Sequence, residues 1–261
     1  MGPWEETIER VAQSFPVGEI MTPNDALTTA KSREEAPFVS DSNPDFSVIP
    51  IRPCRRLTGY FLRGDRSTHD ITLADVISDG TTVLCLLDIL GHREFSFVLR
   101  HNRIEGYVHF SDLNHPLVKL TFYVLLGALE REAEGHVRPL VQRDTSLVEK
   151  ALGEKRLQQL KKKYRQHGDA ARNIFNYMNI SDVLRVAVEA GTIQASDDFI
   201  RLARRARNAA VHPALALVTR HNEVSQLADL NRETLRLLGT MQTSFAPTAE
   251  NLRSMASSVG R

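Results

Sequence analysis

The residues best suited to chemistry are Arg207, Asn208 and His212, which fall within six positions of one another. An arginine stays charged and grips phosphate oxygens with a planar fork, and a histidine titrates near neutral pH and can carry protons. These residue types suit the cleavage of RNA through its own 2′-hydroxyl, in which two protons move and negative charge builds on the phosphoryl group. Pro213 follows directly and disfavours helix at His212, so we expect a helix to end there.

The spacing limits what one copy of this motif can do. Five residues correspond to about 500° of rotation, so the side chains of Arg207 and His212 would lie about 140° apart around an ideal helix. A turn at Pro213 could bring them together, and a symmetric dimer would supply two imidazoles, one as acid and one as base. The alternative is purely structural. Arginines near a helix C-terminus interact favourably with the helix dipole, and His212-Pro213 is then a simple helix stop.

The chain has 261 residues, of which 42% are hydrophobic and 25% charged, a composition typical of globular proteins with one or two domains. Its formal net charge of +1 neither demands nor excludes a nucleic-acid partner. The acidic N-terminus, Met1–Glu6, lacks the features of an export signal. The most apolar run, Leu117–Leu129, is interrupted by Lys119 and is too short to span a bilayer. We therefore expect a soluble, cytoplasmic protein with no membrane partner.

Metal and disulfide sites are not expected. The two cysteines, Cys54 and Cys85, show no metal-ligand spacing, and reduced, packed thiols are the simplest interpretation. The histidines of the first half are dispersed over predicted loops and strands, with no pair at helical spacing.

The first half of the chain contains an internal repeat of α/β type. Strand patterns over 46–51 and 57–62 predict a hairpin, and a second hairpin is predicted over 95–99 and 104–108. A helical pattern over 84–90 precedes the second hairpin. Each hairpin carries a Gly-Tyr pair after its turn, which indicates a period near 48 residues.

This repeat resembles a tandem pair of CBS domains, a module whose paired form often binds adenine nucleotides or S-adenosylmethionine in the cleft between its halves. The resemblance rests on the opening segment Val17–Pro23 and on a glycine followed six residues later by an aspartate. That pattern is Gly106 with Asp112 in the second copy and Gly59 with Asp65 in the first. The resemblance implies that AMP, ATP or S-adenosylmethionine is the regulatory ligand.

The resemblance also implies a set of ligand contacts. Asp112 and Asp65 would accept hydrogen bonds from ribose hydroxyls, and Ile20 and Thr22 of the opening segment would contact the ligand. The family's phosphate-contacting Thr or Ser is replaced by His109 in the second copy and by a leucine in the first. The alternative is that both aspartates only cap helices, since aspartate is a preferred N-cap. For Asp112 both interpretations stay open, whereas for Asp65 the neighbouring leucine favours the cap.

From Pro116 onward the pattern is helical. An apolar helix is predicted from about Leu117, with its end marked by Gly135 and Pro139. A basic run over 155–165 could grip RNA phosphates, although a solvated charged face is the commoner explanation of such a run. The remaining predicted helices cover 145–166, 179–190, 199–211 with Ser196 at its cap, and 223–241.

This half resembles the HEPN superfamily, small helical bundles marked by an arginine, a polar residue and a histidine, which Arg207, Asn208 and His212 match. The resemblance implies a metal-independent endoribonuclease that needs no cofactor for catalysis and forms its active site at a homodimer interface. Arg207 would stabilise phosphoryl charge, His212 would move protons and Asn208 would orient one of them. Members of the superfamily that do not cut RNA also exist.

Together these patterns predict an α+β protein of two domains. They are a tandem CBS module over 1–116, with repeats of about 14–65 and 66–116, and a HEPN-like bundle over 117–245, followed by a flexible tail over 246–261. The functional hypothesis is a homodimeric endoribonuclease that acts on RNA under the control of an adenine-type ligand. The alternative is a non-catalytic adenosine-ligand sensor or dimerising scaffold that regulates a partner protein.

Overall fold

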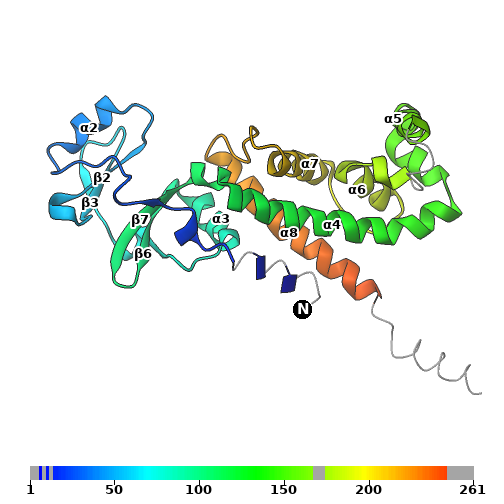
Figure 1. Ribbon diagram of the computed structural model, residues 1–261, viewed down its shortest axis with the longest axis horizontal. Coiled ribbons are helices and arrows are strands. Elements are labelled where there is room, and N and C mark those ends of the chain that lie inside the picture. Colours follow the sequence, from blue (N-terminus) through cyan, green and yellow to red (C-terminus); the bar gives the residue numbers. More distant parts are fainter. Residues whose placement is uncertain (1–5, 8–9, 12–13, 167–173, 246–261) are drawn as a thin grey trace, which may run out of the picture. The chain divides into compact units, whose positions relative to one another are not determined.

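The computed structural model describes residues 6–7, 10–11, 14–166 and 174–245, and it confirms the expected α+β class (Figure 1). The chain divides into two compact units. Among the described residues, an α/β unit is formed by 14–118 with 218–228, and a helical unit by 6–7, 10–11, 119–166, 174–217 and 229–245. The predicted tail over 246–261 lies outside the described residues.

Short strands and helices alternate in the α/β unit. Its helices are α2 (Ala36–Ser42) and α3 (Val83–His92). Its strands are β1 (Thr22–Pro23), β2 (Val48–Ile51), β3 (Gly59–Leu62), β4 (Thr68–Asp70), β5 (Val76–Ser78), β6 (Phe95–Arg100) and β7 (Arg103–His109).

The strands form two sheets, one in the order β2-β3-β4 and one in the order β1-β7-β6-β5. The antiparallel pairs β2–β3 and β6–β7 are the two hairpins predicted from the sequence. Their registers match with an offset of 47 residues, since Val48 pairs with Leu62 and Phe95 with His109. The internal repeat is therefore confirmed, with a period one residue shorter than the sequence suggested.

The two copies exchange their leading strands. β1 opens the first copy but pairs with β7 of the second, where Thr22 lies opposite Tyr107. β4 opens the second copy but pairs with β3 of the first, where His69 lies opposite Tyr60. The two pairs are again related by the offset of 47. Each sheet is therefore completed by a strand from the other copy, which covers an edge that would otherwise be open.

A glycine permits each exchanged strand to approach. A Cβ atom on Gly106 would lie 2.8 Å from the carbonyl oxygen of Thr22, and one on Gly59 would lie 2.5 Å from the carbonyl oxygen of His69. Carbon cannot come this close to a main-chain oxygen unless one strand moves, so only glycine fits at these positions. The strand exchange thus explains the glycine of the Gly-Tyr pair that marks each sequence repeat.

Apolar side chains of both copies form one core between the sheets. Val48, Leu57 and Tyr60 of the first copy are buried against Phe97 of the second. The ring centroids of Tyr60 and Phe97 are 5.7 Å apart, and those of Phe97 and Tyr107 are 5.9 Å apart. Burial of apolar surface contributes about 25 cal/mol per Å², so this shared core stabilises the two copies as a pair.

A segment from late in the chain completes the α/β unit. The Asn114 side chain accepts the main-chain N–H of Val218 at 3.2 Å and donates to the carbonyl oxygen of Val218 at 2.8 Å. His221 Nε2 lies 2.7 Å from the carbonyl oxygen of Leu90 in α3. These contacts attach residues 218–228, including the start of α8, to the α/β unit.

The helical unit contains most of α4 (Pro116–Arg143), all of α5 (Ser146–Gln166), α6 (Ile180–Glu189) and α7 (Asp197–Val211), and most of α8 (Asn222–Phe245). The predicted end of the first of these helices near Gly135 and Pro139 is wrong, because α4 continues with Pro139 inside it. The buried residues Ala133, Val137 and Val141 recur every four positions. Packing of this face offsets the hydrogen bond that the proline removes.

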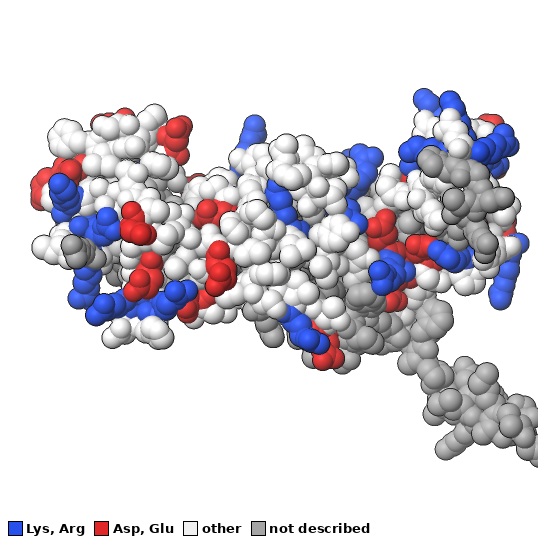
Figure 2. All heavy atoms as spheres, viewed as in Figure 1, with Lys and Arg blue, Asp and Glu red and all other residues white. Residues whose placement is uncertain are grey.

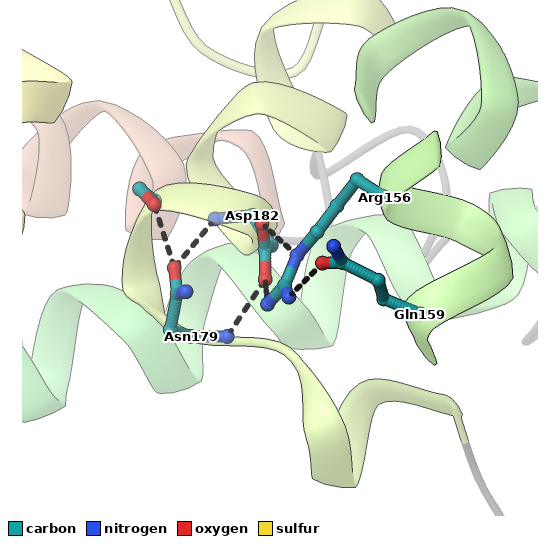
Figure 3. Close-up of polar contacts among 5 residues, drawn as sticks. Arg156, Gln159, Asn179 and Asp182 are labelled. Atoms are coloured by element: carbon teal, nitrogen blue, oxygen red, sulfur yellow. Dashed lines mark hydrogen bonds and ion pairs between the residues drawn. The ribbon is translucent and has the colours of Figure 1, made fainter. Parts of the chain in front are cut away.

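An ion pair joins α5 to α6 (Figure 3). Arg156 donates from Nη2 and Nε to the two carboxylate oxygens of Asp182, at 2.6 and 3.2 Å. Asp182 also closes a capping box with Asn179 at the start of α6, and only 8% of its side chain is exposed. Arg156 is therefore committed to the fold. The exposed lysines that follow it on α5 form the charged surface visible in Figure 2.

Replacement of Gly106 by alanine should destabilise the α/β unit by about 2 kcal/mol, because overpacking in a well-packed site costs about 1–3 kcal/mol. Gly80→Ala is the matched control, since the nearest atom to its added Cβ would be 3.7 Å away. Urea unfolding of both variants and the parent measures the difference. Equal stability of the two variants would contradict the close packing of β1 on Gly106.

Candidate functional site

β7 ends in a turn that places His109 and Asp112 together. The His109 main-chain N–H donates to Asp112 Oδ2 at 2.8 Å, and His109 Nδ1 accepts the main-chain N–H of Ser111 at 3.3 Å. Both contacts cap the 3-10 helix Phe110–Asn114. The capping role considered for Asp112 is therefore present. Its second carboxylate oxygen, Oδ1, has no hydrogen-bond partner among the described residues.

Burial sets the protonation of this pair. It raises the pKa of Asp112 to about 6, although the hydrogen bond from His109 acts in the opposite direction. It lowers the pKa of the His109 imidazole, with Glu94 opposing that shift and His221 adding to it. At neutral pH Asp112 is therefore mostly a carboxylate, and His109 is a neutral imidazole.

Strand exchange brings the opening segment to the same edge of the sheet. Thr22 in β1 pairs with Tyr107, two residues before His109, and Ile20 just before β1 is buried. Ser47, which precedes β2, places its hydroxyl 3.5 Å from His109 Nε2. The sequence-predicted ligand residues of the opening segment and of the second copy therefore lie in one region. Sequence reasoning missed Ser47, although its place at the start of a repeated strand was a usable signal.

Asp65 has different surroundings from its counterpart in the second copy. It lies in the turn after β3, and its carboxylate is 2.6 Å from His69 Nε2, with each side chain 39% exposed. The expectation that Asp65 caps a helix is wrong, because the chain runs from this turn directly into the exchanged strand β4. The two copies thus have corresponding strands, but the aspartates that the family resemblance predicts to bind ribose, Asp65 and Asp112, have different surroundings.

A separate cavity opens at the other end of β3 and β7. Its volume is about 1700 Å³. It is bounded by residues within 24–31, 52–58, 71–76 and 99–105, so both copies contribute to its walls. None of the residues predicted from the sequence to bind a ligand lines this cavity.

In the helical unit, Arg207 of α7 is held against α4. Its guanidinium carbon lies 4.1 Å from the centre of the Tyr123 ring, and its Nε lies 3.7 Å from Glu130 Oε2, which is longer than a hydrogen bond. Its side chain is 21% exposed, and Nε and Nη1 have no hydrogen-bond partner among the described residues. Burial raises the pKa of Glu130, whereas Arg207 lowers it. The guanidinium is therefore stacked on the Tyr123 ring, and Glu130 partly compensates its charge.

His212 and Asn208 lie at the exposed end of α7. The predicted helix end at His212 is confirmed, since its backbone leaves the helical region while its N–H still donates to the Asn208 carbonyl oxygen at 3.0 Å. Both side chains are exposed. Within the described part of the chain, no hydrogen bond or ion pair joins the side chains of Arg207, Asn208 and His212. One chain therefore does not link the predicted catalytic residues to one another.

Lys119 is a residue whose role sequence reasoning missed, because the lysine was taken only as an interruption of an apolar run. It is 8% exposed, and its Nζ donates to the carbonyl oxygens of Pro213 and Leu215 at 2.9 and 2.6 Å. A buried ammonium needs acceptors, so these bonds fix the loop that follows His212. A lysine inside an apolar helix face was the available signal.

Three further features of the described residues concern metal-ligand clusters, membrane-spanning helices and the cysteines. Among them, no group of three or more His, Cys, Asp or Glu side chains is arranged to hold a metal ion. No helix within the described ranges combines the length and apolar character needed to cross a bilayer. Both cysteines are free thiols, and the expectation that they are packed is wrong, because Cys54 and Cys85 are exposed.

Comparisons with known proteins find no matching family model and no matching curated protein. Among solved structures, the CBS domain of the bacterial CNNM/CorC family Mg²⁺ transporter in complex with ATP is 17% identical, covering 44% of this chain and 98% of that chain with a TM-score of 0.33. The same domain in complex with the inhibitor IGN95a is 18% identical, covering 43% and 83% with a TM-score of 0.31. Identities of 17–18% concern the fold alone.

The pKa of Asp112 should make stability depend on pH. Folding raises this pKa from 3.8 to about 6, so the folded state holds the proton more tightly and the free energy of unfolding should fall as the pH rises through this interval. Asp112→Asn keeps an oxygen acceptor for the His109 N–H but cannot ionise. Between pH 4 and pH 7 the parent should lose on the order of 2 kcal/mol relative to this variant. Urea unfolding at both pH values measures this loss, and a constant difference would contradict the burial of Asp112.

Proposed function

We propose that the α/β unit is a regulatory module that binds an adenine nucleotide at the edge formed by Ile20, Thr22, His109 and Asp112. One observation carries this proposal. The exchanged strand β1 pairs Thr22 with Tyr107, beside the turn that holds His109 and Asp112. Residues of the first copy and of the second copy thereby lie on one edge of the sheet. The groups on this edge suit ligand binding rather than bond cleavage.

Each group on this edge has a task in binding. Asp112 Oδ1 accepts a ribose hydroxyl in a charge-assisted hydrogen bond. β1 is the outer strand of its sheet, so the main-chain groups on its open side, next to Thr22, read the adenine edge. The hydroxyl of Ser47 and the neutral imidazole of His109 donate to phosphate oxygens, in the place of the Thr or Ser that the family resemblance leads one to expect.

Calorimetric titration with ATP, AMP and S-adenosylmethionine tests the site. ATP comes first because the similar transporter CBS domain is a complex with ATP. Asp112→Asn should weaken binding at least about tenfold, because a neutral amide oxygen cannot make a charge-assisted hydrogen bond. Asp65→Asn is the matched control in the first copy and should bind like the parent, since Asp65 is exposed and paired with His69.

Two results would refute this site. The first is that the parent binds none of the three ligands. The second is that Asp65→Asn weakens binding as much as Asp112→Asn, which would mean that the aspartates act only through the net charge of the unit. Urea unfolding of each variant at the titration pH ensures that a loss of binding is not a loss of fold.

A second candidate function is RNA cleavage at a homodimer interface, and one observation favours it. Leu120 and Tyr123 of α4, with Val211 and Leu215 at the end of α7 and just after it, are large apolar side chains that are 43–48% exposed. Val211 and Leu215 flank His212 in the chain. On α4, Tyr123 contacts Arg207, and Leu120 is next to Lys119, which binds the carbonyl oxygens of Pro213 and Leu215. A second copy that covered these side chains would also bring a second His212.

In such a dimer the chemistry would be divided between the copies. His212 of one copy takes the proton from the 2′-hydroxyl and His212 of the other gives one to the leaving 5′-oxygen. Arg207 exchanges its long contact with Glu130 for a phosphate oxygen, which holds the developing charge. Asn208 orients one of the transferred protons.

The purified protein should then cut single-stranded RNA in the presence of a metal chelator. His212→Ala should reduce the rate at least about a hundredfold, because general acid–base catalysis contributes roughly 10²–10⁴. His92→Ala, at the exposed end of α3, is the control and should cut like the parent. Unchanged cutting by His212→Ala, or a parent that stays monomeric in sedimentation experiments, would exclude this function.

A further inference from the structure

The cavity at the start of β3 and β7 follows the repeat of the chain. Several of its lining residues are related by the offset of 47 that relates the hairpins, among them Arg56 with Arg103 and Leu57 with Ile104. The segments 24–31 and 71–76, which also line it, are related in the same way. The cavity therefore lies where the two copies meet and presents corresponding side chains from each.

Charge is the feature that points to a ligand. The cavity is lined by four cationic residues, Lys31, Arg52, Arg56 and Arg103, and by only two acidic residues, Asp25 and Glu105. None of these four forms an ion pair with a described residue, although other arginines of the same unit do, such as Arg100 with Asp79 at 2.8 Å. Figure 2 shows Lys and Arg atoms gathered around the free end of the β6–β7 hairpin.

The four cations differ in how far the fold already uses them. Arg52 donates from Nη1 to the carbonyl oxygen of Asn24, so part of its guanidinium is committed to the cavity wall. Arg56 and Arg103 are exposed, and neither side chain forms a hydrogen bond, ion pair or ring contact with the described residues. Uncompensated cations that face one space raise its potential and attract anions. Arg56 and Arg103 are therefore the two groups most available to a ligand.

The number and type of these groups define the ligand. Guanidinium forks match the oxygens of phosphate, and two forks from corresponding positions suit two phosphate groups. The hydroxyl of Thr58 in the wall adds a donor, and Leu57 and Ile104 add apolar surface. A volume of about 1700 Å³ is larger than a single phosphate requires, since small-molecule sites commonly occupy roughly 300–1,000 Å³.

We propose that this cavity binds a ligand that carries at least two phosphate groups, held by Arg56 and Arg103. The site is separate from the edge that holds His109 and Asp112. β7 runs for seven residues between them, a distance of roughly 20 Å at the rise of an extended strand. The proposal does not depend on nucleotide binding at that edge.

Calorimetric titration of the full chain with inorganic pyrophosphate and tripolyphosphate tests the cavity directly. The parent should bind both, with an affinity that falls as salt is added. Arg56→Gln and Arg103→Gln should each weaken binding at least about fivefold and the double variant more than about twentyfold, because each loses one bidentate contact. Arg66→Gln is the matched control, an exposed arginine of the same unit outside the cavity, and should bind like the parent.

The outcomes separate the two sites. Absence of pyrophosphate and tripolyphosphate binding by the parent at millimolar concentration, or an equal loss in Arg66→Gln, would overturn the proposal. Unchanged pyrophosphate binding by Asp112→Asn supports it, because that carboxylate lies at the other end of β7. If ATP binding is lost in the Arg56→Gln and Arg103→Gln double variant but kept in Asp112→Asn, ATP occupies the cavity, which upholds this site and refutes the proposed nucleotide edge.

Discussion

The close approach of main chains at Gly59 and Gly106 is the constraint on which the α/β unit depends. The exchanged strands β1 and β4 are only two and three residues long, so they contribute few hydrogen bonds of their own. Their position is set by the absence of a side chain on the facing strand. From that position follow the shared aromatic core, the placement of Thr22 beside the end of β7, and the space at the opposite end where both copies contribute cations.

The two copies keep the same architecture while their polar groups diverge. In the second copy Asp112 is partly buried and caps a short helix, whereas in the first Asp65 is exposed and paired with His69. Burial shifts the pKa of Asp112 and thereby makes its protonation relevant near physiological pH. The edge that holds His109 and Asp112 therefore has no equivalent beside Asp65, whereas the cavity is lined by corresponding positions of both copies.

Local signals explain which elements could be predicted from the sequence. α7 was predicted with its cap because the Ser196 hydroxyl accepts the Phe199 N–H, a contact within three residues, and the hairpins were visible through alternation over short strands. The strand exchange was not predictable, because a two-residue strand carries no periodicity. The path of α4 through Pro139 and the bonds of Lys119 depend on packing with distant segments, and the cavity's cations are spread over separate stretches of the chain.

The exchange of β1 and β4 also determines how the α/β unit would respond to a broken chain. A cut in the turn between β3 and β4 would separate the two copies into two pieces. The first piece would still place β1 in the sheet of the second, and the second piece would still place β4 in the sheet of the first. Both pieces would also share the core around Phe97. They would stay together as a complementing pair and separate only on unfolding, much as the subunits of a domain-swapped dimer do. Covalent continuity between the repeats is therefore not what makes them one folding unit.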